Sequence, residues 1–439
     1  MSARDGLTRP RIEIQPDWFD YVQNKQLPVD VYVNFKPGSI HLDLTRAQQD
    51  LHALLLIKTP NRNESTIYET SVSDHFETSH IEHDEISIKL KDSVIRHTFK
   101  GPKRMFKPFY DSCKENKTDT SPLINIPELK NLPSVSTSNI HPNCLDINQD
   151  GLGLVGLNDG TINIFNNDNG DIHHTLKGHA QDVYTARFFP SNHLILSGGG
   201  DFLVKIWSLE NDGECRETLT GHTSKINDLA IIGNGEQVVS ISDDGSARLW
   251  NLSNEPNKTV RTICQLDKGI NNCSLFESTL ACACADGYVR TYDINQNNIK
   301  ATSELKIDGA VNCVCYKSDY MICGTEQGII NVYDVRQTNS VVHSWKELRS
   351  KITSLTQLDD DGGLLVTTGD GSTFYHSREM LQVTNIEVET DHSMLYDVVD
   401  YTGPKDDIVL NACVDKNNNI YTVAGDGYVR IYDKVQAKK

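Results

Sequence analysis

The chain has 439 residues, of which 38% are hydrophobic and 23% are charged, and its formal net charge is −18. This length allows one large domain and an additional smaller part. The acidic balance argues against a nucleic-acid partner, because phosphate binding needs clustered Lys and Arg. It favours a basic protein surface as the partner, with solubility as the alternative explanation of the charge.

The apolar runs and the cysteines bear on the compartment. The opening MSARDGLTRPRIEI has no apolar core of a signal peptide, and the longest apolar run, Leu51–Ile57, is far too short to cross a membrane. The eleven cysteines are therefore expected to be free thiols in a reducing compartment. We expect a monomer in the cytoplasm and nucleus, with neither a membrane nor a nucleic acid as partner.

Residues 1–112 are expected to form a small separate module of mostly β structure, with a short helix after Pro16 that makes it α+β. The segment His75–Glu85 is rich in metal-ligand residue types but lacks ligand spacing, so we expect a solvated loop. Residues 113–139 are polar and interrupted by prolines, which predicts a linker or insertion. Strands of the module are predicted in the stretches VDVYVNF, SIHLDL, LHALLLIKT and EISIKLK.

A repeat follows this segment. Ile195–Trp207, ILSGGGDFLVKIW, recurs 43 residues later as Val238–Trp250, VVSISDDGSARLW. Each copy has a strand, a turn centred on Asp and a second strand that ends on Trp. Taking the turn residue as the mark, we find seven units at intervals of 41 to 43 residues, except for a last interval of 56. The marks are Asp159, Asp201, Asp244, Asp286, Gln327, Asp370 and Asp426.

This period, with Gly-His near its start and a WD-like end, predicts an all-β fold, a seven-bladed WD40 β-propeller over residues 140–434. Alternating strand residues give each blade two apolar faces, which only a closed ring of blades can bury. The loop Tyr401–Asp407, YTGPKDD, is expected to hold the extra residues of the last interval. Residues 435–439 are expected to be a tail.

Two units carry the residue types of a WD-repeat hydrogen-bond network, in which a His, a strand hydroxyl, the turn Asp and the Trp satisfy one another. The other five units lack the Gly-His pair, so their stability is expected to depend more on packing. Ser242 is an alternative to Ser240 as the hydroxyl of the second network. The two predicted networks are His179, Ser197, Asp201 and Trp207, and His222, Ser240, Asp244 and Trp250.

The last unit stops at its third strand, Tyr428–Tyr432, so its fourth strand has to come from elsewhere in the chain. The upstream stretch Arg104–Tyr110, RMFKPFY, is the expected donor, and part of Ile124–Val135 is the alternative. We therefore expect a strand from the first part of the chain to close the ring.

No set of residues in the sequence predicts catalysis. The cysteine pairs Cys282/Cys284 and Cys313/Cys315 have the Cys-x-Cys spacing of one strand face rather than the Cys-x-x-Cys of a zinc knuckle, so core packing is expected. SGGGD, Ser197–Asp201, is Gly-rich but opens no helix that could cradle a phosphate. We expect no enzyme activity, no cofactor and no metal.

Protein binding is the remaining role of a propeller. The residue before each turn mark and the residue that opens each inner strand are expected to lie on one face of the ring. On that face Asp182, Asp243 and Glu326 could form an acidic patch that binds a partner, although Lys225 and Lys351 weaken it. The alternative is that these charges are only solvated.

Several stretches resemble the proteasomal ATPase-associated factor family, namely ARFFPSNHLILSGGGDFLVKIWS, VVSISDDGSARLWN, GDGSTF of the sixth unit, IYTVAGDGYVRIYD and the opening IEIQPDWFDYV. Residues 113–137 depart from that family as an insertion. The resemblance implies a non-catalytic chaperone that binds the C-terminal domain of an ATPase subunit during assembly of the base of the proteasome's regulatory particle. By their positions before the turns and at the start of an inner strand, Asp182, Asp243 and Glu326 are the residues expected to contact this subunit.

Two other functions remain open. A generic WD40 scaffold, such as a substrate receptor of a ubiquitin ligase or a signalling adaptor, would co-purify with ligase or signalling subunits. An enzyme built on a propeller would show turnover or a stoichiometric metal.

Overall fold

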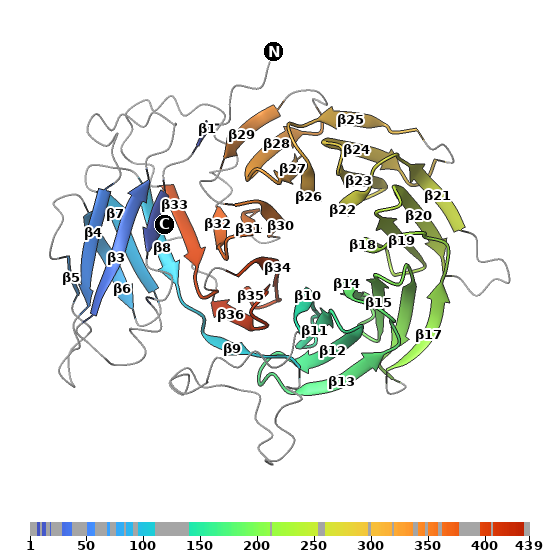
Figure 1. Ribbon diagram of the computed structural model, residues 1–439, viewed down its shortest axis with the longest axis horizontal. Helices are drawn as coiled ribbons and strands as arrows, with labels where there is room; N and C mark the ends of the chain where they lie inside the picture. Colours follow the sequence, from blue (N-terminus) through green and yellow to red (C-terminus); the bar gives the residue numbers. More distant parts are fainter. Residues whose placement is uncertain are drawn as a thin grey trace.

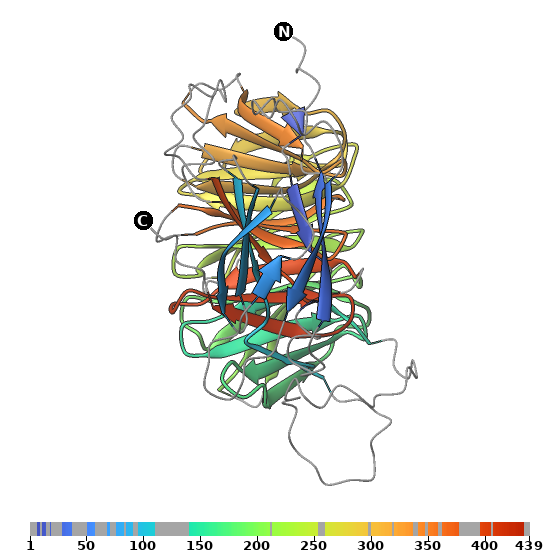
Figure 2. The ribbon, with the colours of Figure 1, turned by 90° about the vertical axis from the view of Figure 1, so that its left-hand side faces the viewer.

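The computed structural model is a ring of β-sheets with further strands from the first part of the chain at its outside (Figures 1 and 2). Every element whose bounds it describes is a strand. No helix among these residues is long and apolar enough to cross a membrane. The described residues are 7–8, 11–14, 18, 29–36, 51–57, 68–70, 76–82, 85–90, 95–109, 140–210, 213–252, 260–296, 300–317, 320–336, 341–346, 350–358, 362–376, 396–404 and 407–433.

Seven blades form the ring, which confirms the predicted seven-bladed all-β propeller. Each blade runs from an inner strand outward through antiparallel neighbours. Blades 1 to 3 are β10 (Pro142–Ile147) to β13 (Ile172–Lys177), β14 (Val183–Phe188) to β17 (Glu214–Leu219), and β18 (Ile226–Ile232) to β21 (Val260–Gln265). The strands between them are β11 (Leu152–Leu157), β12 (Thr161–Asn166), β15 (Leu194–Gly199), β16 (Val204–Ser208), β19 (Gln237–Ser242) and β20 (Ser246–Asn251).

Blades 4 to 7 continue the pattern. Blade 4 is β22 (Ile270–Phe276), β23 (Thr279–Cys284), β24 (Tyr288–Asp293) and β25 (Ser303–Lys306), and blade 5 is β26 (Val311–Lys317), β27 (Tyr320–Thr325), β28 (Ile329–Asp334) and β29 (Val341–Lys346). Blade 6 begins with β30 (Ile352–Gln357), β31 (Leu364–Thr368), β32 (Thr373–His376) and β33 (Tyr396–Tyr401), and blade 7 with β34 (Val409–Val414), β35 (Asn419–Ala424) and β36 (Val429–Asp433).

The apolar core is divided among the spaces between neighbouring blades. Residues of both faces of each sheet are buried, and each buried apolar cluster contains side chains of two adjacent blades. Trp207 of blade 2, for example, packs with Leu154 and Ile164 of blade 1. A blade therefore loses half of its core if its neighbour is missing, and the closed ring is the stable unit.

The first part of the chain supplies the outer strand of blade 7. Strand β9 (Arg104–Phe106), within the stretch named above as donor, pairs antiparallel with β36 through Val429↔Phe106 and Arg430↔Met105. Phe106 is 1% exposed and its ring meets Phe165 of blade 1 edge-on at 5.1 Å. Strand β9 thus completes the sheet of blade 7, and through Phe106 it shares one core cluster with blade 1.

Other upstream strands also enter the propeller, which differs from the expected separate module. Strands β8 (Ile95–Lys100), β7 (Glu85–Leu90) and β6 (Phe76–Glu82) extend blade 6, because β8 pairs in parallel with β33. Strand β1 (Leu7–Thr8) adds to β29 of blade 5. A separate sheet contains β2 (Arg11–Ile14), β3 (Val29–Lys36), β4 (Leu51–Ile57) and β5 (Tyr68–Thr70).

Two expectations about loops are wrong. The segment His75–Glu85 is largely strand β6 rather than a loop. The extra residues of the last repeat interval lie at 377–395, between β32 and β33, and not in Tyr401–Asp407, whose first residue ends β33. Of the short helix expected after Pro16, the structure describes Trp18 alone, which has helical conformation. The SIHLDL strand, the linker 113–139 and the tail 435–439 lie outside the described residues.

Candidate protein-binding face

One backbone hydrogen bond recurs in all seven blades and defines a face of the ring. The residue before the turn mark donates its N–H to the carbonyl of the residue that opens the inner strand, over 2.8 to 3.2 Å. We call the surface formed by these two sets of residues the turn face. The donors are Asn158, Gly200, Asp243, Ala285, Glu326, Gly369 and Gly425, and the acceptors are His141, Asp182, Lys225, Gly269, Ala310, Lys351 and Ile408.

The inner strands direct further side chains to this face. The register shifts at the same position of all seven inner strands, and the shift leaves one bulged residue at the second position. In four blades this residue binds a backbone carbonyl of the next blade at 2.6 to 3.1 Å, and so fastens neighbouring blades together. These residues are Asn227, Asn271, Asn312 and Thr353.

The three acidic residues named above all lie on the turn face but do not form one cluster. Asp182 and Asp243 belong to the neighbouring blades 2 and 3, whereas Glu326 belongs to blade 5. Asp243 accepts a hydrogen bond from Asn227 at 2.6 Å, and its carboxylate is 3.4 Å from the Lys225 ammonium.

Glu326 has the same pattern of partners as Asp243. It accepts a hydrogen bond from Asn312 at 2.8 Å and is 3.9 Å from the Lys351 ammonium. The side chains of Asp243 and Glu326 keep 36% and 51% of their accessible surface. Exposed ion pairs of this kind contribute little free energy, so both carboxylates can exchange their lysine for a partner's cation.

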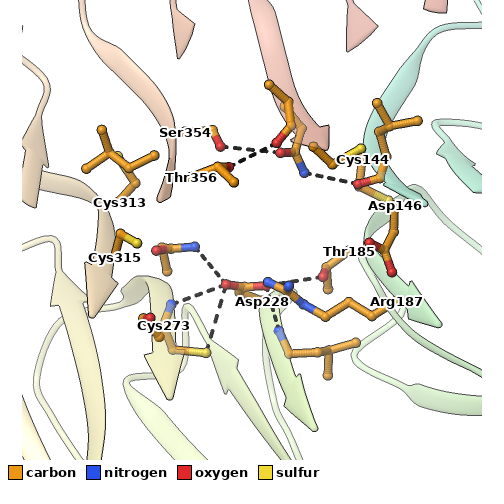
Figure 3. Close-up of a pocket in the computed structure, with 18 of the residues that line it drawn as sticks. Cys144, Asp146, Thr185, Arg187, Asp228, Cys273, Cys313, Cys315, Ser354 and Thr356 are labelled. Atoms are coloured by element: carbon orange, nitrogen blue, oxygen red, sulfur yellow. Dashed lines mark hydrogen bonds and ion pairs between the residues drawn. The ribbon is translucent and has the colours of Figure 1, made fainter. Parts of the chain in front are cut away.

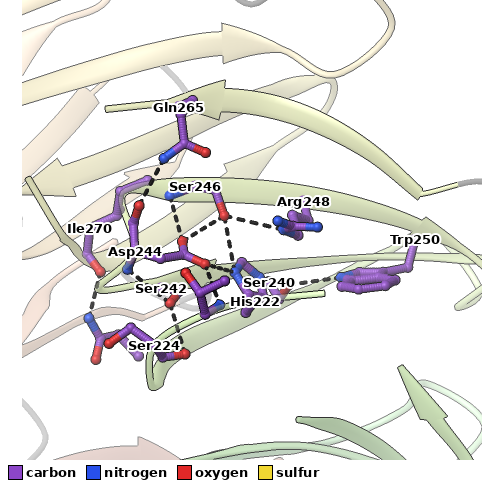
Figure 4. Close-up of polar contacts among 12 residues, drawn as sticks. His222, Ser224, Ser240, Ser242, Asp244, Ser246, Arg248, Trp250, Gln265 and Ile270 are labelled. Carbon is purple, nitrogen blue, oxygen red and sulfur yellow. Dashed lines mark hydrogen bonds and ion pairs between the residues drawn. The ribbon is translucent and has the colours of Figure 1, made fainter. Parts of the chain in front are cut away.

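The network of blade 3 connects the turn to the buried Trp250 of the third strand, β20 (Figure 4). The Trp250 indole N–H donates to Ser240 Oγ at 2.8 Å, His222 Nε2 is 2.7 Å from the same oxygen, and His222 Nδ1 is 2.9 Å from the Asp244 carboxylate. Burial lowers the pKa of His222, although the hydrogen bond to Asp244 acts in the opposite direction. The neutral imidazole then donates from Nδ1 and accepts the serine hydroxyl at Nε2.

The Asp244 carboxylate is held as an anion by this network. Burial by itself would raise its pKa, but hydrogen bonds from Ser246, the Thr223 backbone N–H and His222 outweigh burial and lower the pKa to about 2. The turn is therefore anchored by a charged acceptor whose lone pairs are satisfied.

Blade 2 has the equivalent network. Trp207 donates to Ser197 Oγ at 2.8 Å, and His179 lies 2.8 Å from that oxygen and 2.9 Å from the Asp201 carboxylate. Burial lowers the pKa of His179, against the opposing hydrogen bond with Asp201. These bonds fix the turns that carry the turn face in blades 2 and 3.

Blades 4 and 7 hold their turn aspartates in a different way. An Arg four residues after the Asp takes the place of the missing His: Arg290 pairs with Asp286 at 2.7 Å, and Arg430 binds Asp426. In these two blades an ion pair supplements packing, which the sequence reasoning missed. The signal was present as DGYVR in both units.

The inner strands enclose a central channel of about 1030 Å³ (Figure 3). Asp228 of blade 3 lies in its wall and accepts hydrogen bonds from Arg187 of blade 2 at 2.8 Å and from Asn272 of blade 4 at 2.7 Å. The attraction of Asp228 raises the pKa of Arg187. The pKa of Asp146 is raised by burial, against the field of Arg187. This network connects three blades and stabilises the ring from inside.

The paired cysteines lie in the core. Cys282, Cys284 and Cys313 are at most 2% exposed, and Cys315 is half-buried. Burial raises the pKa of Cys284 to about 12 and raises those of Cys313 and Cys315 as well, which disfavours the thiolate that metals and electrophiles need. No three His, Cys, Asp or Glu side chains among the described residues are placed to hold a metal ion.

The fold and the turn face define a WD40 propeller, a class that typically serves as a non-catalytic scaffold for protein–protein interactions. The model of the family "WD domain, G-beta repeat" matches residues 170–208 and 213–251, which contain the two hydrogen-bond networks. The chain is also similar to the human protein Proteasomal ATPase-associated factor 1, with 43% identity over 63 residues. That similarity covers 13% of this chain and 16% of the human protein.

Proposed function

We propose that the chain is a non-catalytic chaperone for assembly of the base of the proteasome's regulatory particle, in the cytoplasm and nucleus. Its turn face would bind the C-terminal domain of a proteasomal ATPase subunit, with Asp182, Asp243 and Glu326 as contacts. The observation that carries the proposal is the acidic turn face of a scaffold fold, combined with a local similarity to a protein whose name links it to proteasomal ATPases.

Charge supports a basic partner for this face. Among the described residues of the turns and of the connections into the inner strands, acidic residues outnumber cations. Such a field accelerates encounter with a basic surface and aligns it on the ring. The exposed acids are Asp159, Asp243, Asp267, Asp286, Asp308, Glu326 and Asp370. The cations are Lys268, Lys225 and Lys351, and the side chains of Lys225 and Lys351 keep 41% and 37% of their accessible surface.

The test is charge reversal on the turn face. The double variant Asp243→Lys and Glu326→Lys should bind purified C-terminal domains of proteasomal ATPase subunits about ten-fold more weakly than the wild type, and the loss should shrink as salt rises. Titration calorimetry at two salt concentrations measures this. Undiminished binding by the double variant would remove these two residues from the interface.

Glu277→Lys is the matched control, because Glu277 is an exposed acid in the turn between β22 and β23, outside the turn face. It should leave the affinity unchanged. A scaffold of a ubiquitin ligase or signalling complex is the alternative function. Mass spectrometry of affinity-purified partners separates the two, because the alternative predicts ligase or signalling subunits and no proteasomal ATPase.

A further inference from the structure

One turn of the ring has a residue that its backbone conformation disfavours. Phe202 follows the turn mark of blade 2 with φ of +67°. The equivalent position is glycine in the other six blades, with φ between +77° and +87°. A side chain in this left-handed region is strained, and a bulky one is uncommon there. Blade 2 thus tolerates an unfavourable residue at a place where glycine would fold more easily.

The aromatic ring of Phe202 is also exposed. Phe202 keeps 41% of its accessible surface and is one of four large apolar residues described as exposed, with Val260, Val341 and Ile408. A strained residue whose side chain is well buried can be explained by packing, but this explanation is weak for an exposed ring. Strained residues of this kind concentrate at sites that bind ligands or partners.

Blade 2 also differs from the other blades at the bulged position of its inner strand. The bulged position of the inner strand is Tyr184, where four other blades have a residue that clasps the next blade. The ring of Tyr184 lies beside the backbone of Gly200, and the Lys225 ammonium is 5.2 Å from the centre of this ring. Lys225 in turn pairs with Asp243. Blade 2 therefore adds an aromatic ring to the turn face, beside the ion pair of Lys225 with Asp243.

We propose that Phe202 is the apolar anchor of the turn face and receives an aliphatic side chain that lysines or arginines flank on a basic partner protein. Aromatic residues that stay exposed in the free protein dominate the binding energy of many interfaces when a partner covers them. The acidic residues of the turn face select the partner by charge, and the ring supplies contact that charge alone cannot give. This inference takes from the proposed function only that the turn face binds protein.

The decisive variant is Phe202→Gly, which restores the residue of the other six turns. It should melt at or above the wild-type temperature, because it relieves the strained backbone, and yet bind C-terminal domains of proteasomal ATPase subunits at least about ten-fold more weakly. Phe202→Asn is the second variant, because Asn tolerates the left-handed region and keeps a side chain. Val260→Ala, which trims an exposed apolar residue of an outer strand, is the control and should bind as the wild type does.

A second probe separates this inference from the proposed function. A helical Leu/Lys peptide and its Leu/Glu counterpart are titrated by fluorescence anisotropy, and the Leu/Lys peptide should bind the wild type several-fold more tightly than Phe202→Gly. If the wild type binds the peptide in this way but no ATPase domain, the proposed function fails and the anchor stands. The anchor is overturned if the wild type and Phe202→Gly bind every ligand with equal affinity. It is also overturned if binding weakens only in variants that melt well below the wild type.

Discussion

Truncation of Phe106 tests whether a strand from the first part of the chain holds the ring closed. Phe106 lies in β9, is almost fully buried and packs between blades 7 and 1. Its ring meets Phe165 edge-on, and the position of a Cβ on Gly170 would be only 2.8 Å from it, so the ring touches that backbone closely. Phe106→Ala would leave a cavity at the junction between blades 7 and 1, the two ends of the repeat.

The size of the effect follows from the burial. Truncating a buried Phe to Ala costs about 3–5 kcal/mol. Unfolding entropy is about 2.1 cal/mol/K per residue, so for a chain of 439 residues it is roughly 0.9 kcal/mol/K. The melting temperature of Phe106→Ala should therefore fall by about 3–5 °C, and differential scanning calorimetry at several scan rates measures it.

Phe109→Ala is the matched control, because Phe109 is three residues further on and only half-buried. Its melting temperature should fall by clearly less. Deletion of residues 1–112 should have a larger effect than either substitution, because it removes β9 together with the strands that extend blades 5 and 6. A Phe106→Ala protein that melts within about 1 °C of the wild type would refute the closure of the ring through β9.

Two further predictions concern the hydrogen-bond networks. Ser240→Ala removes the oxygen shared by the His and the Trp of blade 3, and should lower the free energy of unfolding by about 1–3 kcal/mol in urea titrations. The pH dependence follows from His179 and His222, whose pKa values are lowered in the folded state. The unfolded chain then binds more protons, so this contribution is complete above the ordinary histidine pKa of about 6.5 and is lost as pH falls below it.

Each of these predictions has its own control. Ser191→Ala, which removes a hydroxyl from an exposed turn, should change the free energy of unfolding by less than about 0.5 kcal/mol. The control for the pH dependence is the double variant His179→Asn and His222→Asn. If the free energy of unfolding of the wild type changed between pH 7 and pH 5 as little as that of this variant, the two histidines would not be neutral in the fold. His193→Asn should keep the wild-type slope, because His193 is exposed.

The sequence by itself determined the number of blades and the two networks. The period of 41 to 43 residues is a local property, because each unit contains its own strands and turn. The same residue types therefore recur at equivalent positions of successive units. The spacing of His222, Ser240, Asp244 and Trp250 is fixed within one unit for the same reason. A last unit that lacks its fourth strand also pointed to a donor upstream, where β9 lies.

Only the tertiary structure decided how the first part of the chain joins the ring. The parallel pairing of β8 with β33 joins residues about 300 positions apart, such as Ile95 and Tyr396, and no local pattern specifies such a partner. The ion pair of Arg187 with Asp228 likewise depends on two blades that meet in the channel. The sequence shows Phe202 as a break in the series of turn glycines, but its exposure depends on packing that only the folded ring defines.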